Sequence, residues 1–301
     1  MIIHGRRDIW RARAVVALAL LAALMALLAG APGTGAQSDV ASAADEEARP
    51  ALLFIITGQS NAGQQGTATE LTASRRAPVA GAWYYAPQHT RQTKAVALQP
   101  YGGTFGVELS FARAVAQATG REVVVAKVFR GGTSVIAWSP AYGTTQWKRD
   151  MQAVGHKPSL ALAMYPKVLK TAADAAASYR AQTGRPVELA GLAYIQVERD
   201  SKFLYGAQRY RGNLTELIGA LRLAWGAPDL PVVFIDSHTN LSGGGPIVHD
   251  AVLAVSADVP GTAWVEVRDL PKKQATHFSS TGVLMLGERL AEAWLGLWEA
   301  R

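Results

Sequence analysis

The chain of 301 residues contains no cysteine, which excludes disulfides and attachment of a lipid through cysteine. A domain of this size buries a large core and does not need disulfides. The sequence also has no phosphate-binding loop, no Gly-x-Gly-x-x-Gly fingerprint and no Gly-x-Ser-x-Gly elbow of the α/β hydrolases. Its histidines do not have the spacing of metal ligands. We therefore expect no metal and no cofactor.

Basic runs are also missing, although the formal net charge is +7. Residues 1–36 contain four Arg and one Asp, which leaves 26 basic and 22 acidic residues, or +4, for the rest of the chain. The basic residues of that part are scattered, and none of their runs is longer than Lys272-Lys273. A nucleic-acid groove requires a basic stripe, so we expect no nucleic-acid partner.

The N-terminal segment carries the only targeting signal. Arg6, Arg7, Arg11 and Arg13 precede an apolar run over residues 15–29, and small residues follow up to Ala36. This pattern predicts a signal peptide over residues 1–36, because the apolar run is short of the about 20 residues that span a bilayer. We expect a flexible lead-in over residues 37–50 and a domain over 51–301. The protein is expected to be secreted or periplasmic, with no stable membrane association after cleavage. The oligomeric state is left open.

Apolar runs and amphipathic stretches alternate through that domain. Strands are expected over residues 52–56, 123–129, 189–195, 231–235 and 263–267, and helices over 107–119, 160–181, 208–226, 249–257 and 279–298. This alternation predicts an α/β fold with a central parallel sheet and helices on both faces.

Several polar residues stand where the expected strands end. Ser60 follows the first strand, Gln196 and Glu198 follow the third, and His277 precedes the last helix. Gly106 stands at the start of an earlier helix. Chemistry in open α/β sheets gathers beyond the carboxyl ends of strands. Hydrolysis by serine needs a nucleophile, a histidine base, a group that orients the base, and oxyanion donors. From Ser60 alone, an ordinary strand-to-helix turn is an equal alternative.

Four blocks in this order carry a family resemblance: Gly58-Gln59-Ser60-Asn61, residues 106–112, Gln196-Val197-Glu198, and His277 with Gly287 downstream. They resemble the sialate O-acetylesterase and acetylxylan esterase branch of the SGNH hydrolases over about residues 52–295. The resemblance implies a flavodoxin-like three-layer α/β/α sandwich and removal of acetyl esters from carbohydrates.

The resemblance also implies roles for single residues. Ser60 matches the nucleophile and His277 the general base. The N–H groups of Ser60 and Gly106 match two oxyanion donors, and the Gln196 side chain matches a third. Backbone and side-chain amides stabilise an oxyanion without titrating, so each role is chemically reasonable.

Two positions depart from the family pattern. Val197 stands where the family has Gly, and Gln274 stands where the family has the Asp three residues before the histidine. A neutral amide does not stabilise an imidazolium as a carboxylate does. We therefore expect Glu198 to orient His277, with a solvated loop acid as the alternative. Asp200 and Trp138 are weaker candidates for substrate binding, and core packing is an equal alternative for Trp138.

The sequence thus predicts a secreted serine esterase that hydrolyses O-acetyl esters on a carbohydrate, such as sialate or xylan, through an acyl-Ser60 intermediate. The two departures keep a non-catalytic carbohydrate-binding protein open as an alternative. A glycan O-acetyltransferase that uses the same acyl-serine is the other alternative.

Overall fold

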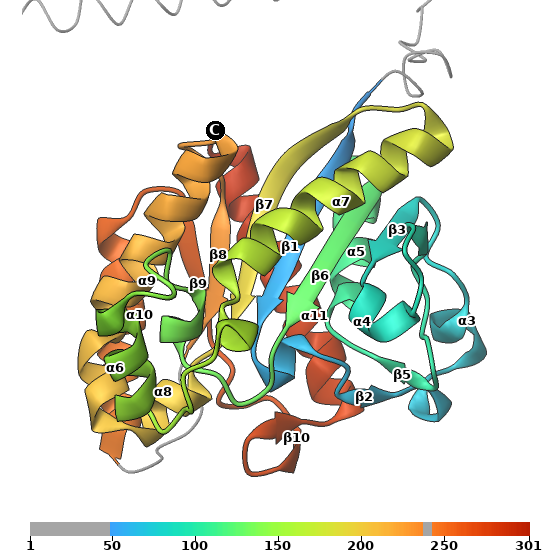
Figure 1. The fold of residues 1–301 in the computed structure, drawn as a ribbon. Coiled ribbons are helices and arrows are strands. Elements are labelled where there is room, and N and C mark those ends of the chain that lie inside the picture. Colours follow the sequence, from blue (N-terminus) through green and yellow to red (C-terminus); the bar gives the residue numbers. More distant parts are fainter. Residues whose placement is uncertain (1–48, 237–242) are drawn as a thin grey trace, which may run out of the picture. The chain divides into compact units, whose positions relative to one another are not determined.

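The computed structural model describes residues 49–236 and 243–301. The predicted signal peptide and nearly all of the lead-in lie outside the described residues. Within the described part, no helix is both long and apolar enough to cross a membrane. The predicted α/β fold with a central, mostly parallel sheet between helices is confirmed (Figure 1).

The main sheet has seven strands in the order β4-β3-β6-β1-β7-β8-β9. Only β4 among them runs antiparallel to its neighbour. Their bounds are β1 (Ala51–Gly58), β3 (Ala82–Tyr85), β4 (Val96–Ala97), β6 (Val123–Phe129), β7 (Val187–Ile195), β8 (Val232–Ile235) and β9 (Thr262–Val265). The order β6-β1-β7-β8-β9 is the flavodoxin-like 2-1-3-4-5, and β3 and β4 extend the sheet beyond β6.

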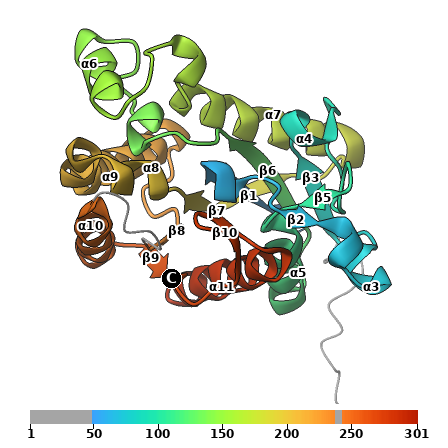
Figure 2. The same cartoon turned by 90° about the horizontal axis from the view of Figure 1, so that it is seen from below.

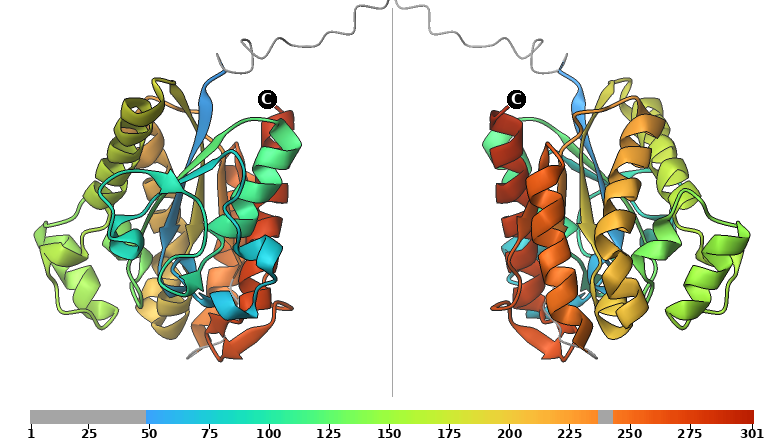
Figure 3. Two further views of the ribbon diagram at one scale, coloured as in Figure 1. Left: turned by 90° about the vertical axis from the view of Figure 1, so that its right-hand side faces the viewer. Right: turned by 90° about the vertical axis from the view of Figure 1, so that its left-hand side faces the viewer.

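Helices cover both faces of this sheet. The long helices are α5 (Glu108–Thr119), α7 (Tyr165–Thr183), α9 (Leu204–Trp225), α10 (Gly244–Asp258) and α11 (Ser280–Glu299). α5 and α11 pack against each other on one face, and α7 lies on the opposite face with α9 (Figures 2 and 3). α10 packs against α9 and β9. Every residue of β1 is buried, which explains its continuous apolar run.

Shorter elements lie mostly beyond the carboxyl ends of the parallel strands. The 3₁₀ turns are η1 (Ser60–Ala62), η2 (Ala68–Glu70), η3 (Val135–Trp138) and η4 (Leu160–Leu162). The short helices are α3 (Ala73–Arg76), α4 (Pro87–Thr90), α6 (Thr145–Ala153) and α8 (Glu198–Lys202), and the short strands are β2 (Gly66–Thr67), β5 (Thr104–Phe105), β10 (Lys272–Gln274) and β11 (His277–Phe278).

The helix expected over residues 160–181 begins later than its composition indicates. η4 forms a separate turn, and α7 starts at Tyr165 with Pro166 in its first turn. Proline is tolerated there because the first helical N–H groups have no partner within the helix.

Candidate active site

Ser60 stands directly beyond the end of β1, at the strand where the order of the sheet reverses. Gly58 permits this close turn: its φ is 140°, and a Cβ there would lie 2.0 Å from Ile195 O of β7. Gln59 N–H then donates to the same carbonyl at 2.9 Å. Ser60 begins η1 and is only half-buried, so its hydroxyl remains accessible. This is the position at which open α/β sheets bind their ligands.

His277 lies within hydrogen-bond reach of that hydroxyl. Its Nε2 is 3.0 Å from Ser60 Oγ, and its Nδ1 is 2.9 Å from Gln274 Oε1. Gln274 ends β10 and His277 begins β11, and these two strands pair as an antiparallel hairpin across a tight turn. The hairpin thus brings the amide to one side of the ring, while the other side faces Ser60.

This geometry selects one tautomer of His277. The carbonyl oxygen of Gln274 only accepts, so Nδ1 carries the proton and donates to it. Nε2 is then left as the acceptor for the Ser60 hydroxyl. A Ser-His-Gln triad of this kind places a general base beside a serine nucleophile. An amide is also the third residue of the Cys-His-Asn triads.

Glu198 does not take the place that the sequence analysis expected. Both ring nitrogens of His277 have their partners in Ser60 and Gln274, and no hydrogen bond among the described residues joins Glu198 to the ring. Glu198 begins α8, and its carboxylate accepts from the side chain of Asn61 and from Val197 N–H at 3.2 Å. At the start of a short helix, the carboxylate turns back toward these donors.

Asn61 connects Glu198 with the histidine segment, a contact that the sequence analysis missed. Asn61 Nδ2 also donates to Thr276 O at 2.8 Å, and Asn61 Oδ1 accepts from Phe278 N–H at 3.3 Å. The residue after the nucleophile therefore holds the backbone on both sides of His277. Glu198 is thus linked to the segment of His277 through the side chain of Asn61.

Gly106 is not an oxyanion donor in this structure. Its N–H donates to Glu108 Oε1 at 3.0 Å inside the buried start of α5. The expectation for Gly106 is therefore wrong, because an N–H already bonded to a buried carboxylate is not free to receive an oxyanion.

Gln196 and Asp200 form a buried network instead of meeting a substrate. Gln196 Nε2 donates to Thr133 O at 3.0 Å and to Asp200 Oδ2 at 2.6 Å, which uses both of its amide hydrogens. Asp200 is fully buried and accepts in addition from Ser134 Oγ at 2.6 Å and Val135 N–H at 2.9 Å. Burial raises the pKa of Asp200 to about 6, while these donors act in the opposite direction. Neither the oxyanion role of Gln196 nor substrate binding by Asp200 fits these contacts.

The segment that this network holds lies beside Ser60. A Cβ on Gly131 would stand 3.7 Å from Ser60 Cβ, and β6, which precedes Gly131, pairs directly with β1. Among the described residues, the N–H groups of Ser60 and Gly131 have no acceptor. N–H groups without an acceptor beside a nucleophile are candidates for an oxyanion hole. Gly131 and Gly132, which follow β6 after Arg130, were the sequence signal for this loop.

Trp138 belongs to the core. Its ring is fully buried, packs edge-on against Tyr194 at 5.6 Å, and donates from Nε1 to Thr57 Oγ1 at 3.1 Å. The expectation that it stacks on a sugar is wrong, because no part of the ring reaches the surface. Within residues 49–236 and 243–301, no group of His, Asp and Glu is arranged to hold a metal ion.

The contact between Ser60 and His277 lies where the strand order of a flavodoxin-like sheet reverses, as the resemblance to the SGNH hydrolases predicts. The family described as carbohydrate esterase, sialic acid-specific acetylesterase matches residues 50–296, and the chain belongs to this family. The predicted family resemblance is thereby confirmed, and the chain is a carbohydrate esterase.

Three solved structures show the same fold. A protein from Arabidopsis thaliana aligns with a TM-score of 0.63 and 19% identity over 82% of this chain and 99% of its own. XAC1771, a carbohydrate acetylesterase from Xanthomonas citri, aligns with a TM-score of 0.58 and 16% identity over 83% of this chain and 57% of its own. NanS aligns with a TM-score of 0.58 and 14% identity over 84% of this chain and 98% of its own. A search of the curated proteins found no match.

Proposed function

We propose that this carbohydrate esterase removes O-acetyl groups from a glycan by transfer of the acetyl group to Ser60 and then to water. The observation that carries the proposal is the 3.0 Å contact between Ser60 Oγ and His277 Nε2, with Nδ1 held by Gln274. Export from the cytoplasm is part of the proposal and rests on the basic and apolar pattern of residues 1–36.

The reaction follows from the atoms in place. Nε2 takes the proton of Ser60 as Oγ attacks the acetyl carbonyl, and the N–H groups of Ser60 and Gly131 stabilise the oxyanion. Collapse of the tetrahedral intermediate returns the proton to the departing sugar oxygen and leaves acetyl-Ser60. Water, activated by the same nitrogen, then releases acetate and restores the serine.

Ser60→Ala and His277→Ala test the assignment. Each variant is expected to release acetate at least about 10³-fold more slowly, and the double variant little more slowly than either, because the pair acts as a unit. Ser74→Ala on α3 is the matched control for loss of a hydroxyl and is expected to keep full activity. The assay is acetate release from p-nitrophenyl acetate and a panel of acetylated glycans, beginning with O-acetyl sialate because the family description names sialic acid.

The same assay separates the alternatives. A folded Ser60→Ala protein that works at the parent rate overturns the assignment. A parent that binds acetylated glycan and releases no acetate supports the binding protein instead. A parent that transfers acetyl groups to added glycan faster than to water supports the transferase.

A further inference from the structure

Lys127 and Glu108 form an ion pair inside the core that the proposed reaction does not use. Lys127 Nζ is 2.5 Å from Glu108 Oε2, and the two side chains are 0% and 2% exposed. Lys127 stands within β6, where its register partner in β1 is Ile56. Apolar residues of the same volume are often equally stable in such a place, so stability alone does not explain the charges.

The pair joins the nucleophile loop, residues 60–65 between β1 and β2, to the start of α5. Lys127 Nζ donates to Gly63 O at 3.2 Å, and Glu108 Oε1 accepts from Gly106 N–H at 3.0 Å. A Cβ on Gly106 would lie 2.4 Å from both Gly63 O and Lys127 Nζ. Gly106 therefore serves this close approach, which accounts for a glycine at this position without an oxyanion role.

Gly63 is one hydrogen bond from the nucleophile. Its N–H donates to Ser60 O at 2.9 Å and closes the turn η1. Gly63 thus contacts the ion pair through its carbonyl oxygen and Ser60 through its N–H. A displacement of Gly63 moves the turn that carries Oγ.

A second link reaches the same loop through Tyr84 of β3. Gln64 Nε2 donates to Tyr84 Oη at 3.0 Å. Burial and then the nearby Glu108 carboxylate raise the pKa of Tyr84 well above its usual range, so its hydroxyl stays protonated. Two consecutive residues of the nucleophile loop, Gly63 and Gln64, are therefore fixed by groups around Glu108.

We propose that Lys127 and Glu108 are positioning residues that hold the loop after Ser60, and thereby hold Ser60 Oγ in line with His277. This inference rests on the proposed function. The charges supply directional contacts to Gly63 O and Gly106 N–H that an apolar pair of equal size does not make. β6 is a central strand, so the anchor is more rigid than the loop that it holds.

The test replaces both partners at once, as Lys127→Met with Glu108→Leu, which leaves no unpaired charge. The primary readout is the rate at which a fluorophosphonate modifies Ser60, followed by mass spectrometry, because this probe needs no glycan and no deacylation. The double variant is expected to keep the parent's melting temperature within a few degrees. We expect labelling and kcat to fall by about 10- to 100-fold, the scale for a misplacement of about 1 Å, with KM changed much less.

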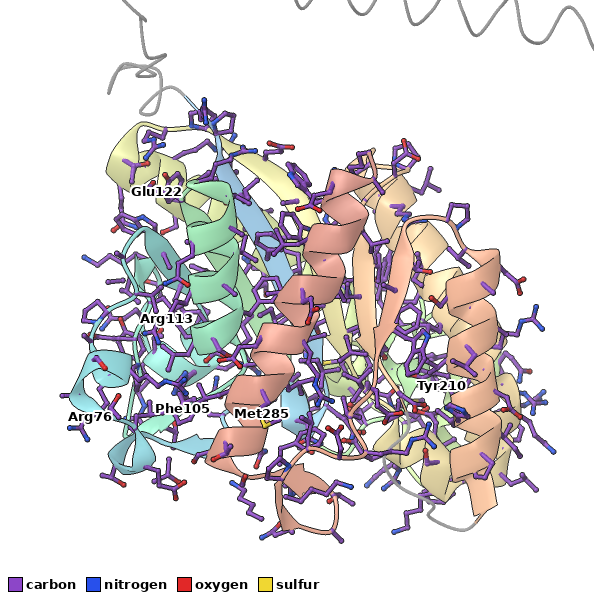
Figure 4. The ribbon with its side chains drawn as sticks, turned by 180° about the vertical axis from the view of Figure 1, so that it is seen from behind. Arg76, Phe105, Arg113, Glu122, Tyr210 and Met285 are labelled. Carbon is purple, nitrogen blue, oxygen red and sulfur yellow. The ribbon has the colours of Figure 1, made fainter. Side chains whose placement is uncertain are left out.

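The matched control is a second ion pair at the other end of β6. Arg185 Nη1 lies 2.6 Å from Glu122 Oε2. Figure 4 shows Glu122 just beyond the end of α5 that is remote from Phe105. Arg185→Met with Glu122→Leu is expected to leave the labelling rate and kcat unchanged.

Each outcome decides the inference. A folded double variant that is labelled as fast as the parent overturns it. If the double variant does not fold, Lys127→Met removes the donor to Gly63 O and leaves Glu108 as the acceptor for Gly106 N–H, and unchanged labelling of that variant also overturns it. A parent that is not labelled at Ser60 overturns the proposed function itself, and this inference with it.

Discussion

At the scale of single residues, Gln274 is the group that decides how well His277 works as a base. Its carbonyl oxygen lies 2.9 Å from Nδ1 and accepts the proton there, so the tautomer is the one that serine chemistry needs. In a Ser-His-Asp triad, replacing the carboxylate by an amide costs about 10⁴ in kcat because the wrong tautomer results. That cost does not apply in full here, because the tautomer is already correct. What the amide lacks is the negative charge that stabilises the imidazolium.

Gln274→Glu is therefore expected to raise kcat. Glutamate is isosteric with glutamine, so the oxygen on Nδ1 keeps its place, whereas aspartate is one methylene shorter. Gln274 is exposed, and solvent screens the added charge, so the gain is expected to stay at or below about tenfold. Steady-state kinetics on p-nitrophenyl acetate measure it, and Gln274→Ala is expected to lower kcat instead.

Glu198→Gln is the companion variant, because Glu198 was the orienting acid expected from the sequence. Asn61 retains an acceptor in the glutamine carbonyl, so kcat is expected to change by less than about fivefold, the effect of a typical single hydrogen bond of about 1 kcal/mol. A severe loss in Glu198→Gln together with an inert Gln274→Glu would return the orienting role to Glu198.

At the scale of elements, the loop after β6 is set against Ser60 by contacts made from β7 and α8. Gln196, just beyond β7, donates to Thr133 O, and Asp200 of α8 accepts from Ser134 and Val135. Gly131 lies in the loop that these contacts hold. A side chain there meets Ser60 Cβ at ordinary contact distance, so it has room but covers the donor.

Gly131→Val is accordingly expected to lower kcat by about 10²-fold, the low end for loss of one oxyanion donor, with little change in melting temperature. Gly219→Val on an exposed face of α9, where a Cβ meets nothing within 4 Å, is the control. A large fall in the melting temperature of Gly131→Val would mean that this glycine serves the fold and not the oxyanion.

These elements also show what the sequence predicts and what it does not. Buried strands such as β1 and β6 are predicted because a parallel strand covered on both faces has a continuous apolar run. The pairing of β6 with β1, which brings Gly131 to Ser60, depends on strand order, and the alternation pattern carries no information about it. Ser60 and His277 were found from the family blocks. The hydrogen-bond partners of Gly106, Gln196 and Glu198 were not predicted. A buried amide or acid bonds to whichever polar groups the tertiary fold brings near.

At the scale of the whole molecule, Asp200 couples the ionisation of one acid to the stability of the fold. It is fully buried and joins Gln196, which follows β7, to Ser134 and Val135 in the segment after β6. His156, whose Nε2 accepts from Ser134 N–H at 3.4 Å, is the neighbouring titratable group, and burial lowers its pKa to about 4. The two shifts have opposite effects on stability in the same pH range, so the parent's pH profile alone does not resolve them.

The comparison of the parent with Asp200→Asn isolates the acid. The pKa of Asp200 is raised from 3.8 to about 6, so the folded state binds more protons than the unfolded state between these pH values. The stability that protonated Asp200 contributes is complete below pH 3.8 and is lost as pH rises through 6. At about 1.36 kcal/mol per pKa unit, the parent's advantage over Asp200→Asn in the free energy of unfolding is expected to shrink by about 2–3 kcal/mol between pH 4 and pH 7. Urea denaturation at both pH values measures this change, with Asp250→Asn at an exposed position as the baseline. An advantage that grows with pH would mean that the donors of Ser134, Val135 and Gln196 outweigh burial and hold the pKa of Asp200 below 3.8.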